Sequence, residues 1–142
     1  MRLVKHLLEG KGDAIHAIGP DQPVLDAIRM MADKYVGALL VMDGTQLVGI
    51  VSERDYARKV ILLGRSSAQT PVREIMTASV LTIAPGDSVH HCMKLMTDRR
   101  VSHLPVIENG KVIGVLSIGD LVKAVIDDQA EQLEHLQRYI AG

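Results

Sequence analysis

Aliphatic and amphipathic stretches follow one another in a fixed order along the first half of the chain. A short apolar piece, HAI (16–18), precedes a proline-containing turn and the amphipathic stretch PVLDAIRMMADKY (23–35), which predicts a helix. Two aliphatic runs come next, ALLVM (38–42) and LVGIVS (47–52), and the DGT between them is typical of a hairpin turn. A second helix is predicted over about residues 53–63, so the order of elements is β-α-β-β-α.

The second half of the chain repeats this order with different residues. LTI (81–83) precedes SVHHCMKLMTDRR, in which Val89, Met93 and Met96 recur at helical spacing. The runs LPVIE and KVIGVLS flank an Asn-Gly pair, which is a stronger hairpin signal than DGT. A helix is expected from about Ile118 onward.

Residues suited to helix starts precede the first helix of each copy. Asp87 or Ser88 can cap the helix of the second copy, and Asp21 or Pro23 can begin that of the first.

The two halves align without a gap when the sequence is shifted by 65 residues, as from Ile18 to Ile83. The shift superposes identical residues at ten positions or more: Ile18 on Ile83, Pro20 on Pro85, Val24 on Val89, Met31 on Met96, Val36 on Val101, Leu39 on Leu104, Val41 on Val106, Gly49 on Gly114, Ser52 on Ser117 and Asp55 on Asp120. A match over about 48 positions indicates an internal duplication, and two copies are too few for a solenoid. We therefore expect an α/β (α+β) fold of two repeats related by pseudo-two-fold symmetry.

The sequence divides into an N-terminal helical segment (1–13), a first repeat (14–63), a linker (64–78), a second repeat (79–126) and a C-terminal helix (127–142). In the linker, TPVREIM is interpreted as a short helical turn with Thr70 as its cap and Pro71 at its first position. In the C-terminal helix, Leu133, Leu136 and Ile140 share one side. We expect both chain ends to pack on the core or on a partner subunit.

Composition narrows the class of protein. The formal net charge of −1 over 142 residues predicts no attraction to nucleic acid or to a membrane surface. The single cysteine, Cys92, excludes an intrachain disulfide and fits a reducing compartment. The N-terminus lacks the features of a signal peptide, and no apolar run approaches the roughly 20 residues of a membrane span. We expect a soluble, cytoplasmic protein.

The phrases GIVSERD (49–55) and GVLSIGD (114–120) have two interpretations that the residues leave open. Serine with aspartate three residues later, between a strand and a helix, is a variant of the capping box, and the aspartate suits the helix dipole. The same geometry can bind a ligand, because bare amides and a hydroxyl suit a phosphate and an aspartate can accept from ribose hydroxyls. The glycine three residues before each serine can allow a ligand or the backbone to approach closely.

The duplicated unit, the Ile-x-Pro starts, the SHLPV and TPVREIMT pieces and the paired Gly-x-x-Ser-x-x-Asp phrases resemble tandem cystathionine β-synthase (CBS) domains, a pair called a Bateman module. The resemblance covers about residues 14–126. With no catalytic domain appended, the chain looks like a stand-alone bacterial CBS-pair protein. The resemblance implies a regulatory module with two clefts that bind adenosine compounds: AMP as the first candidate, ATP, ADP, NAD(H) or S-adenosylmethionine. It also implies a homodimer and an unidentified regulated protein.

The resemblance assigns a role to each candidate site residue. Asp55 and Asp120 would hold ribose hydroxyls, and Ser52 and Ser117 would meet the first phosphate or the ribose. The first strands would present backbone groups to adenine, the starts of the second strands would line the other wall, and His103 and Arg54 would touch phosphates. The remaining residues of this set are Ala17, Ile18, Gly37, Ala38, Leu39, Thr82, Ile83, Ser102 and Leu104.

The copies differ in charge. Glu53-Arg54 in the first copy corresponds to Ile118-Gly119 in the second, and Gly37-Ala38 corresponds to Ser102-His103. We therefore expect the two clefts to differ in ligand or affinity, with Arg54 favouring a longer polyphosphate or a dinucleotide.

Other chemistry has little support. His90, His91 and Cys92 are adjacent on a helix and point in different directions, so an ordinary helix surface is preferred over a metal site. Glycine-rich phosphate loops, zinc-protease motifs and nucleophile elbows are absent from the sequence, so we expect no enzyme. Three function classes remain: an adenine-nucleotide sensor, a small nucleotide-dependent enzyme, and a structural dimerisation module without ligand.

Overall fold

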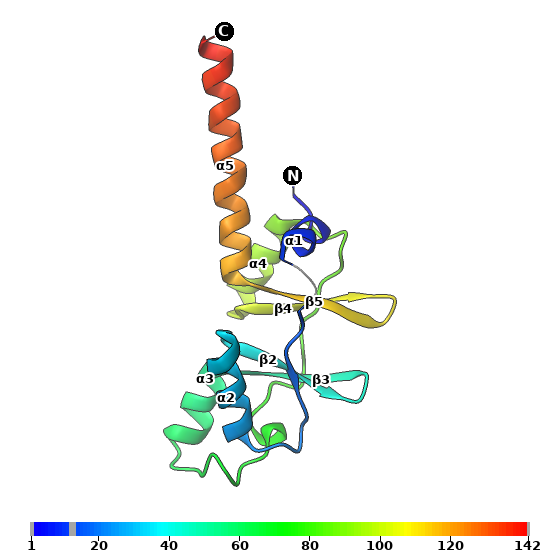
Figure 1. Ribbon diagram of the computed structural model, residues 1–142, viewed down its shortest axis with the longest axis vertical. Coiled ribbons are helices and arrows are strands. Elements are labelled where there is room, and N and C mark those ends of the chain that lie inside the picture. The colour runs from blue at the N-terminus through cyan, green and yellow to red at the C-terminus, as the bar shows by residue number, and fades with distance from the viewer. Residues whose placement is uncertain (1, 12–13, 142) are drawn as a thin grey trace. The chain divides into compact units, whose positions relative to one another are not determined.

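The computed structural model describes residues 2–11 and 14–141 (Figure 1). The chain separates into two compact units. The first-repeat unit, residues 14–81, holds the first repeat and the linker. The second-repeat unit, residues 1–13 and 82–142, holds the second repeat and both chain ends. Mixed helices and strands in two small sheets confirm the expected α+β class.

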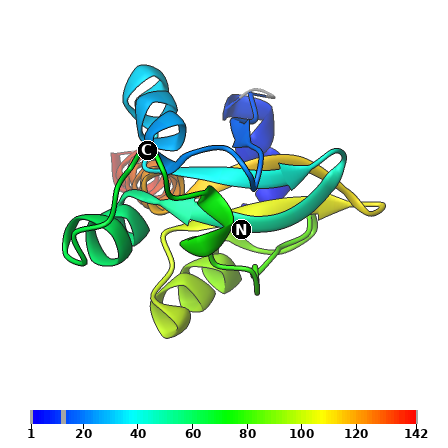
Figure 2. The ribbon, with the colours of Figure 1, turned by 90° about the horizontal axis from the view of Figure 1, so that it is seen from below.

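The first-repeat unit follows the predicted order of elements. Its strands and helices are β1 (Ala17–Ile18), α2 (Val24–Lys34), β2 (Ala38–Asp43), β3 (Gln46–Ser52), α3 (Glu53–Tyr56), the π-helical turn η1 (Ala57–Ile61) and the 3-10 turn η2 (Val72–Glu74). β1 pairs with β2 in parallel, and β2 pairs with β3 antiparallel. The turn of the β2–β3 hairpin points away from α2 and α3 (Figure 2). The helix expected over 53–63 is therefore divided into a short α-helix and a π-helical turn.

Aliphatic side chains from every layer of this unit form its core. Both β2 and β3 contribute, as do α2 and the linker: the buried residues are Ile18, Val24, Ala27, Met31, Leu39, Val41, Val51, Val60, Val72 and Ile75. The linker is thus part of the first-repeat core rather than a free connector.

The second-repeat unit contains α1 (Val4–Lys11), α4 (Val89–Arg99), β4 (His103–Glu108), β5 (Lys111–Ser117) and α5 (Ile118–Ala141). α5 is one continuous helix of 24 residues, so the tail continues the second repeat's last helix as predicted. The strand expected at LTI is wrong: Ile83 forms only an isolated parallel bridge with Val106. In the first repeat, the Leu40 N–H donates to the His16 carbonyl at 3.1 Å. Its counterpart, Pro105, has no N–H, so this bond cannot form.

Local geometry confirms the internal duplication. Ala38 faces Ser52 across its hairpin as His103 faces Ser117, and both hairpins shift register at equivalent positions after Val41 and Val106. The first helix of each repeat ends on a left-handed residue at the same place, Tyr35 and Arg100, both with φ of 55°.

The helix starts resolve the alternatives left by the sequence. Ser88 caps α4, because its hydroxyl accepts from the His91 N–H at 3.0 Å, whereas Asp87 accepts from the Ala84 N–H. Pro23 occupies the N-cap position of α2. Thr70 was expected to cap the linker turn, with Pro71 at its first position. The turn begins one residue later: Pro71 is the N-cap of η2, and no side chain caps it.

The segment before each repeat packs on the other repeat. RLVKHLL (2–8) and TPVREIM (70–76) make equivalent backbone bonds: the Val4 N–H donates to the Asp87 carbonyl, and the Val72 N–H donates to the Gln22 carbonyl, both at 2.9 Å. The carbonyls of residues 2 and 70 accept from the first residues of α4 and α2. Each unit is therefore completed by a segment that precedes the other repeat in sequence.

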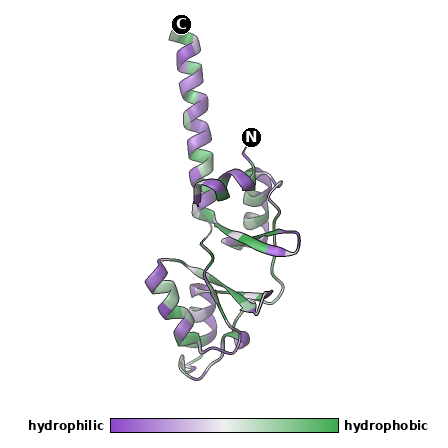
Figure 3. Cartoon of the chain, turned by 45° about the vertical axis from the view of Figure 1, so that its right-hand side comes forward, coloured by the Kyte–Doolittle hydropathy of each residue, from purple (hydrophilic) through white to green (hydrophobic). Residues whose placement is uncertain are grey.

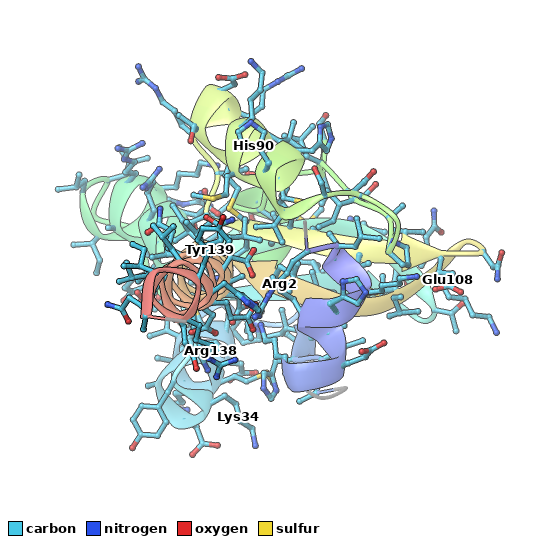
Figure 4. The ribbon with its side chains drawn as sticks, turned by 90° about the horizontal axis from the view of Figure 1, so that it is seen from above. Arg2, Lys34, His90, Glu108, Arg138 and Tyr139 are labelled. Carbon is cyan, nitrogen blue, oxygen red and sulfur yellow. The ribbon has the colours of Figure 1, made fainter. Side chains whose placement is uncertain are left out.

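The two chain ends meet different surroundings. The N-terminal segment packs on the core as predicted, since Val4 is fully buried. Arg2 reaches α5 and forms an ion pair with Asp128 at 2.6 Å (Figure 4). Apolar positions recur along the outer part of α5 (Figure 3), and Leu133 and Ile140 there are 56% and 76% exposed. Packing of this helix on a partner subunit stays a prediction. Within residues 2–11 and 14–141, no helix combines the length and apolarity that crossing a bilayer requires.

Candidate functional site

Strand register brings the candidate residues of the first repeat to one end of its sheet. Ala38 begins β2 and lies directly opposite Ser52, the last residue of β3. The Glu53 N–H donates to the Gly37 carbonyl at 3.1 Å, which fixes the start of α3 beside the start of β2. β1 runs parallel to β2, and Ala17 pairs with Leu40 at this same end.

The second repeat assembles its candidate residues in the same way. His103 lies opposite Ser117, and the Ile118 N–H donates to the Ser102 carbonyl at 2.8 Å. Ile83 donates its N–H to the Pro105 carbonyl at 3.0 Å, so the segment before α4 still reaches this end of the β4–β5 pair.

Both Ser-x-x-Asp phrases form capping boxes. The Asp55 N–H donates to Ser52 Oγ at 3.1 Å, and the Ser52 N–H donates back to Asp55 Oδ2 at 3.0 Å. The corresponding distances for Asp120 and Ser117 are 3.2 and 2.8 Å. The capping interpretation is therefore confirmed in both repeats, and the ligand interpretation of the same residues stays a prediction.

The capping bonds leave some acceptors and donors for a ligand. Of the first three amides of α3, those of Glu53 and Asp55 are already bonded. As far as the described residues extend, this leaves the Arg54 N–H at the helix start, and the same reasoning leaves the Gly119 N–H on α5. Fewer bare amides are present than the sequence alone suggested.

The solvent exposure of each candidate residue determines whether its side chain or only its backbone can contact a ligand. Four are at most 3% exposed, so their side chains belong to the cores and only their backbone can reach a ligand: Ile18, Leu39, Ile83 and Leu104. Arg54 and Thr82 are exposed. The others are partly buried at the sheet ends: Ala17, Gly37, Ala38, Ser52, Asp55, Ser102, His103, Ser117 and Asp120.

Each aspartate is paired with a lysine, but the two lysines come from different elements. Lys59, in η1, approaches Asp55 Oδ1 to 3.3 Å and donates to the Ile75 carbonyl at 2.9 Å. Lys11, the last residue of α1, donates to Asp120 Oδ2 at 2.7 Å and to the Val115 carbonyl at 2.7 Å.

Lys11 also sets the charge states around it. Burial alone would raise the pKa of Asp120, but the hydrogen bonds from Lys11 and Ser117 and the Lys11 charge hold it below its usual value. Burial, and then the Lys11 charge, lower the pKa of His103 despite the opposing effect of Asp120. His103 is therefore neutral at neutral pH and can offer a phosphate a hydrogen bond but no charge.

The glycine of each phrase is required by close packing of the segments described above. A Cβ on Gly49 would lie 2.5 Å from Met76 Sδ and 3.0 Å from the Thr77 carbonyl oxygen. A Cβ on Gly114 would lie 2.6 Å from Leu8 Cδ2. The expectation of a close backbone approach is thus met at Gly49, while at Gly114 the neighbour is a side chain.

Lys11 and Lys59 were not predicted from the sequence as neighbours of the aspartates. The shift of 65 residues aligns the repeats but leaves RLVKHLL unmatched, so it did not predict which repeat the N-terminal segment contacts. A shift of 68 residues, as from Val4 to Val72, aligns RLVKHLL with TPVREIM and would have placed α1 against the second repeat.

The histidines considered as metal ligands lie on a helix surface. His90 and His91 are exposed on α4, where His90 projects outward (Figure 4), and Cys92 is buried beneath them. Burial, and then the charge of Asp87, raise the pKa of the Cys92 thiol to about 11. Across the described parts of the chain, no three His, Cys, Asp or Glu side chains are grouped as metal ligands would be.

Known proteins share this duplicated architecture. The profile of the CBS domain family matches residues 13–61 and 72–127. The mitochondrial CBS domain-containing protein CBSX3 of Arabidopsis thaliana is 46% identical over 127 residues, which cover 86% of this chain and 62% of the relative. The solved structure of a protein with CBS domains from Burkholderia ambifaria is 52% identical, with a TM-score of 0.87, and the match covers 90% of this chain and 96% of that one.

A more distant solved structure contains ligands. It is the CBS domain pair of protein MJ0100 in complex with 5′-methylthioadenosine and S-adenosyl-L-methionine. It is 22% identical to this chain, with a TM-score of 0.80, and the match covers 90% of this chain and 98% of that one. At 22% identity, this comparison supports a shared fold alone.

Proposed function

The chain belongs to the CBS domain family, and on that premise we propose that it is a regulatory module which binds adenosine-containing ligands. Each repeat would bind one ligand at its capping box and would transmit binding as a change of shape to a regulated protein. Regulation by binding, rather than catalysis, is the proposed activity.

One observation carries the proposal: in both units a serine hydroxyl, an aspartate, a first-turn amide and the start of the first hairpin strand meet at one sheet end. Asp55 keeps 15% of its side chain exposed and Asp120 keeps 29%, so each carboxylate can still be reached. Such a carboxylate can accept from both hydroxyls of a ribose, and the remaining amide can donate to a phosphate.

Adenine would be held by backbone groups and aliphatic surfaces. With no Phe or Trp in the chain, stacking on those rings is unavailable. The carbonyls and amides beside Ile18 and Ile83 are the donors and acceptors that adenine would meet. AMP is the first ligand to test, followed by ATP, ADP, NAD(H) and S-adenosylmethionine, because all contain the same adenosine.

Thermal denaturation with each compound tests the proposal. A ligand present at a hundred times its dissociation constant adds about 2.7 kcal/mol to the free energy of unfolding. We expect at least one adenosine compound to raise the melting temperature, while guanosine and cytidine analogues leave it unchanged. The same melting temperature with every adenosine compound would refute ligand binding.

Variants separate a ligand contact from a cap. Asp55→Ala and Asp120→Ala should each abolish ligand binding at one repeat while the chain stays folded. Ser88→Ala is the matched control, because it removes the cap of α4, a helix without a candidate site residue, and should cost a similar 0.5–2 kcal/mol, about the usual range for a cap. If both aspartate variants bind the ligand normally, the two aspartates cap their helices and do not contact the ligand.

The outer surface of α5 favours a second role, homodimer formation, either with ligand binding or as a structural dimerisation module without it. Leu133, Leu136 and Ile140 are spaced three and four residues apart and are 55% exposed or more. Leu136→Glu should convert a dimer to monomers in sedimentation experiments. His135→Glu adds the same charge at the neighbouring position and should leave the dimer intact.

A further inference from the structure

The aspartate of the second repeat is paired with a cation that its own repeat does not contain. Lys11 Nζ donates to Asp120 and to the Val115 carbonyl, each at 2.7 Å. An ammonium group has three protons, so one remains for a further acceptor. The Lys11 side chain is 38% exposed, which leaves this proton within reach of a ligand.

The position of Lys11 follows from the divergence of two otherwise equivalent segments. After Met76 the helical turn has ended, and Thr77 exchanges two backbone hydrogen bonds with Ile50, at 2.9 and 3.0 Å. α1 instead continues as a helix, so Lys11 Nζ takes the place of that backbone N–H on the equivalent carbonyl, Val115. A neutral backbone donor in one unit is thus replaced by a charged side chain in the other.

Among the described residues, the helix after the second capping box supplies no ion-pair partner to Asp120, and Lys123, three residues further on, is exposed. The counterpart of Lys59 is Ala124, which is buried, and Ile118-Gly119 replaces Glu53-Arg54. Within the described residues, Lys11 is the cation paired with Asp120, whose charge would otherwise repel an anionic group. Lys11 cancels that charge.

We infer that Lys11 is a specificity-determining residue of the second repeat, and that it makes the Ser117–Asp120 site select adenosine ligands with a phosphate on the 5′ carbon. The inference rests on the proposed function and names the ligand class for one repeat. With the ribose on Asp120, the remaining Lys11 proton can be donated to a phosphate oxygen as a charge-assisted hydrogen bond. A 5′-methylthio group accepts no such bond, and the sulfonium of S-adenosylmethionine is repelled by the ammonium.

Titration calorimetry of the full chain with AMP, adenosine and S-adenosylmethionine tests this assignment. Lys11→Met should weaken AMP binding at one site roughly tenfold, the effect of losing one charge-assisted hydrogen bond, and should leave adenosine within about twofold. Lys5→Met is the matched control, because Lys5 is exposed on the same helix. Lys11→Arg should retain the preference for AMP.

Background variants assign the effect to a repeat. The loss caused by Lys11→Met should persist together with Asp55→Ala and disappear together with Asp120→Ala. Circular dichroism of each variant reports folding, and Lys11→Gln provides a second neutral residue if Lys11→Met unfolds.

Three results overturn the inference. Equal losses for AMP and adenosine in Lys11→Met would make Lys11 a structural residue, and tighter binding of both would make it a competing counter-ion. Unchanged AMP affinity in Lys11→Met would mean that Lys11 does not contact the ligand. In each of these cases the wild-type chain still binds an adenosine compound, so the proposed function survives; if the wild type binds none, both fall.

Discussion

In the first repeat, the lysine beside the capping-box aspartate lies one turn further along the same helical segment, as Lys59 does from Asp55. In the second repeat, the lysine comes from α1, 109 residues before Asp120 in sequence. The backbone around the two boxes is nevertheless equivalent, with Ala38 opposite Ser52 and His103 opposite Ser117. Duplication has therefore kept the hairpin register and the capping boxes and changed the source of the charge.

The difference shows where ligand preference can change without loss of the fold. Capping boxes and hairpin register depend on Gly, Ser and Asp at fixed spacing, and altering them costs stability. The cation comes from a neighbouring segment, η1 in one unit and α1 in the other. Its replacement leaves the core untouched, so the charge at each site can vary independently of the repeat itself.

The largest expected effect contrasts the two glycines. Gly49→Ala should lower the free energy of unfolding by about 2–3 kcal/mol, because its Cβ meets the Thr77 backbone as well as Met76. Gly114→Ala should cost about 1 kcal/mol or less, because the flexible Leu8 side chain can move aside. Urea denaturation of both variants measures the difference. Equal costs would mean that the two segments pack with the same rigidity.

The next effect concerns His103, whose counterpart is Ala38. Burial lowers the pKa of His103, so the folded chain binds this proton less readily than the unfolded chain does. The stability contribution is thus present above the unfolded pKa of about 6.5 and is lost as the pH falls below it. Unfolding free energies measured from pH 7.5 to 5 should fall less steeply for His103→Gln, by about 1 kcal/mol or less. Parallel curves for the variant and the wild type would contradict the lowered pKa.

A smaller effect concerns the pH dependence of the Lys11–Asp120 pair. The pKa of Asp120 is held below its usual value, so its contribution to stability is present above about pH 4 and is lost as the pH falls through the folded pKa. Lys11→Met should reduce stability at neutral pH by under about 1 kcal/mol, since both side chains are partly exposed. The difference from the wild type should shrink as the pH falls through the folded pKa of Asp120, and a difference that is constant with pH would assign it to packing.

Much of the fold and part of the site could be predicted from the sequence. The 65-residue shift, as from Ser52 to Ser117, placed the strands, the hairpins and both capping phrases, because short-range periodicity and turn residues determine them. The first strand of the second copy could not be judged in this way, because Pro105, whose counterpart Leu40 donates an N–H to the first strand, is distant from it in sequence.

The partners of the aspartates were less accessible to sequence analysis. Lys59 could have been noticed, because it lies four residues after Asp55 on the same helical stretch. Lys11 meets Asp120 only through tertiary packing, in which RLVKHLL crosses to the second repeat. No local pattern around Asp120 indicates it, and only alignment of RLVKHLL with TPVREIM would have suggested it.

The smallest effect tests why the second repeat lacks its first strand. Pro105→Leu introduces the residue that the first repeat has at Leu40 and restores an N–H that can donate to the Leu81 carbonyl. We expect a change in stability of about 1 kcal/mol or less, because one added backbone bond is offset by repacking of a buried site. Hydrogen exchange followed by NMR is the sensitive measurement: the new amide should exchange as slowly as that of Leu40. Fast exchange would mean that the Leu81 carbonyl stays unbonded to β4 for a reason other than the proline.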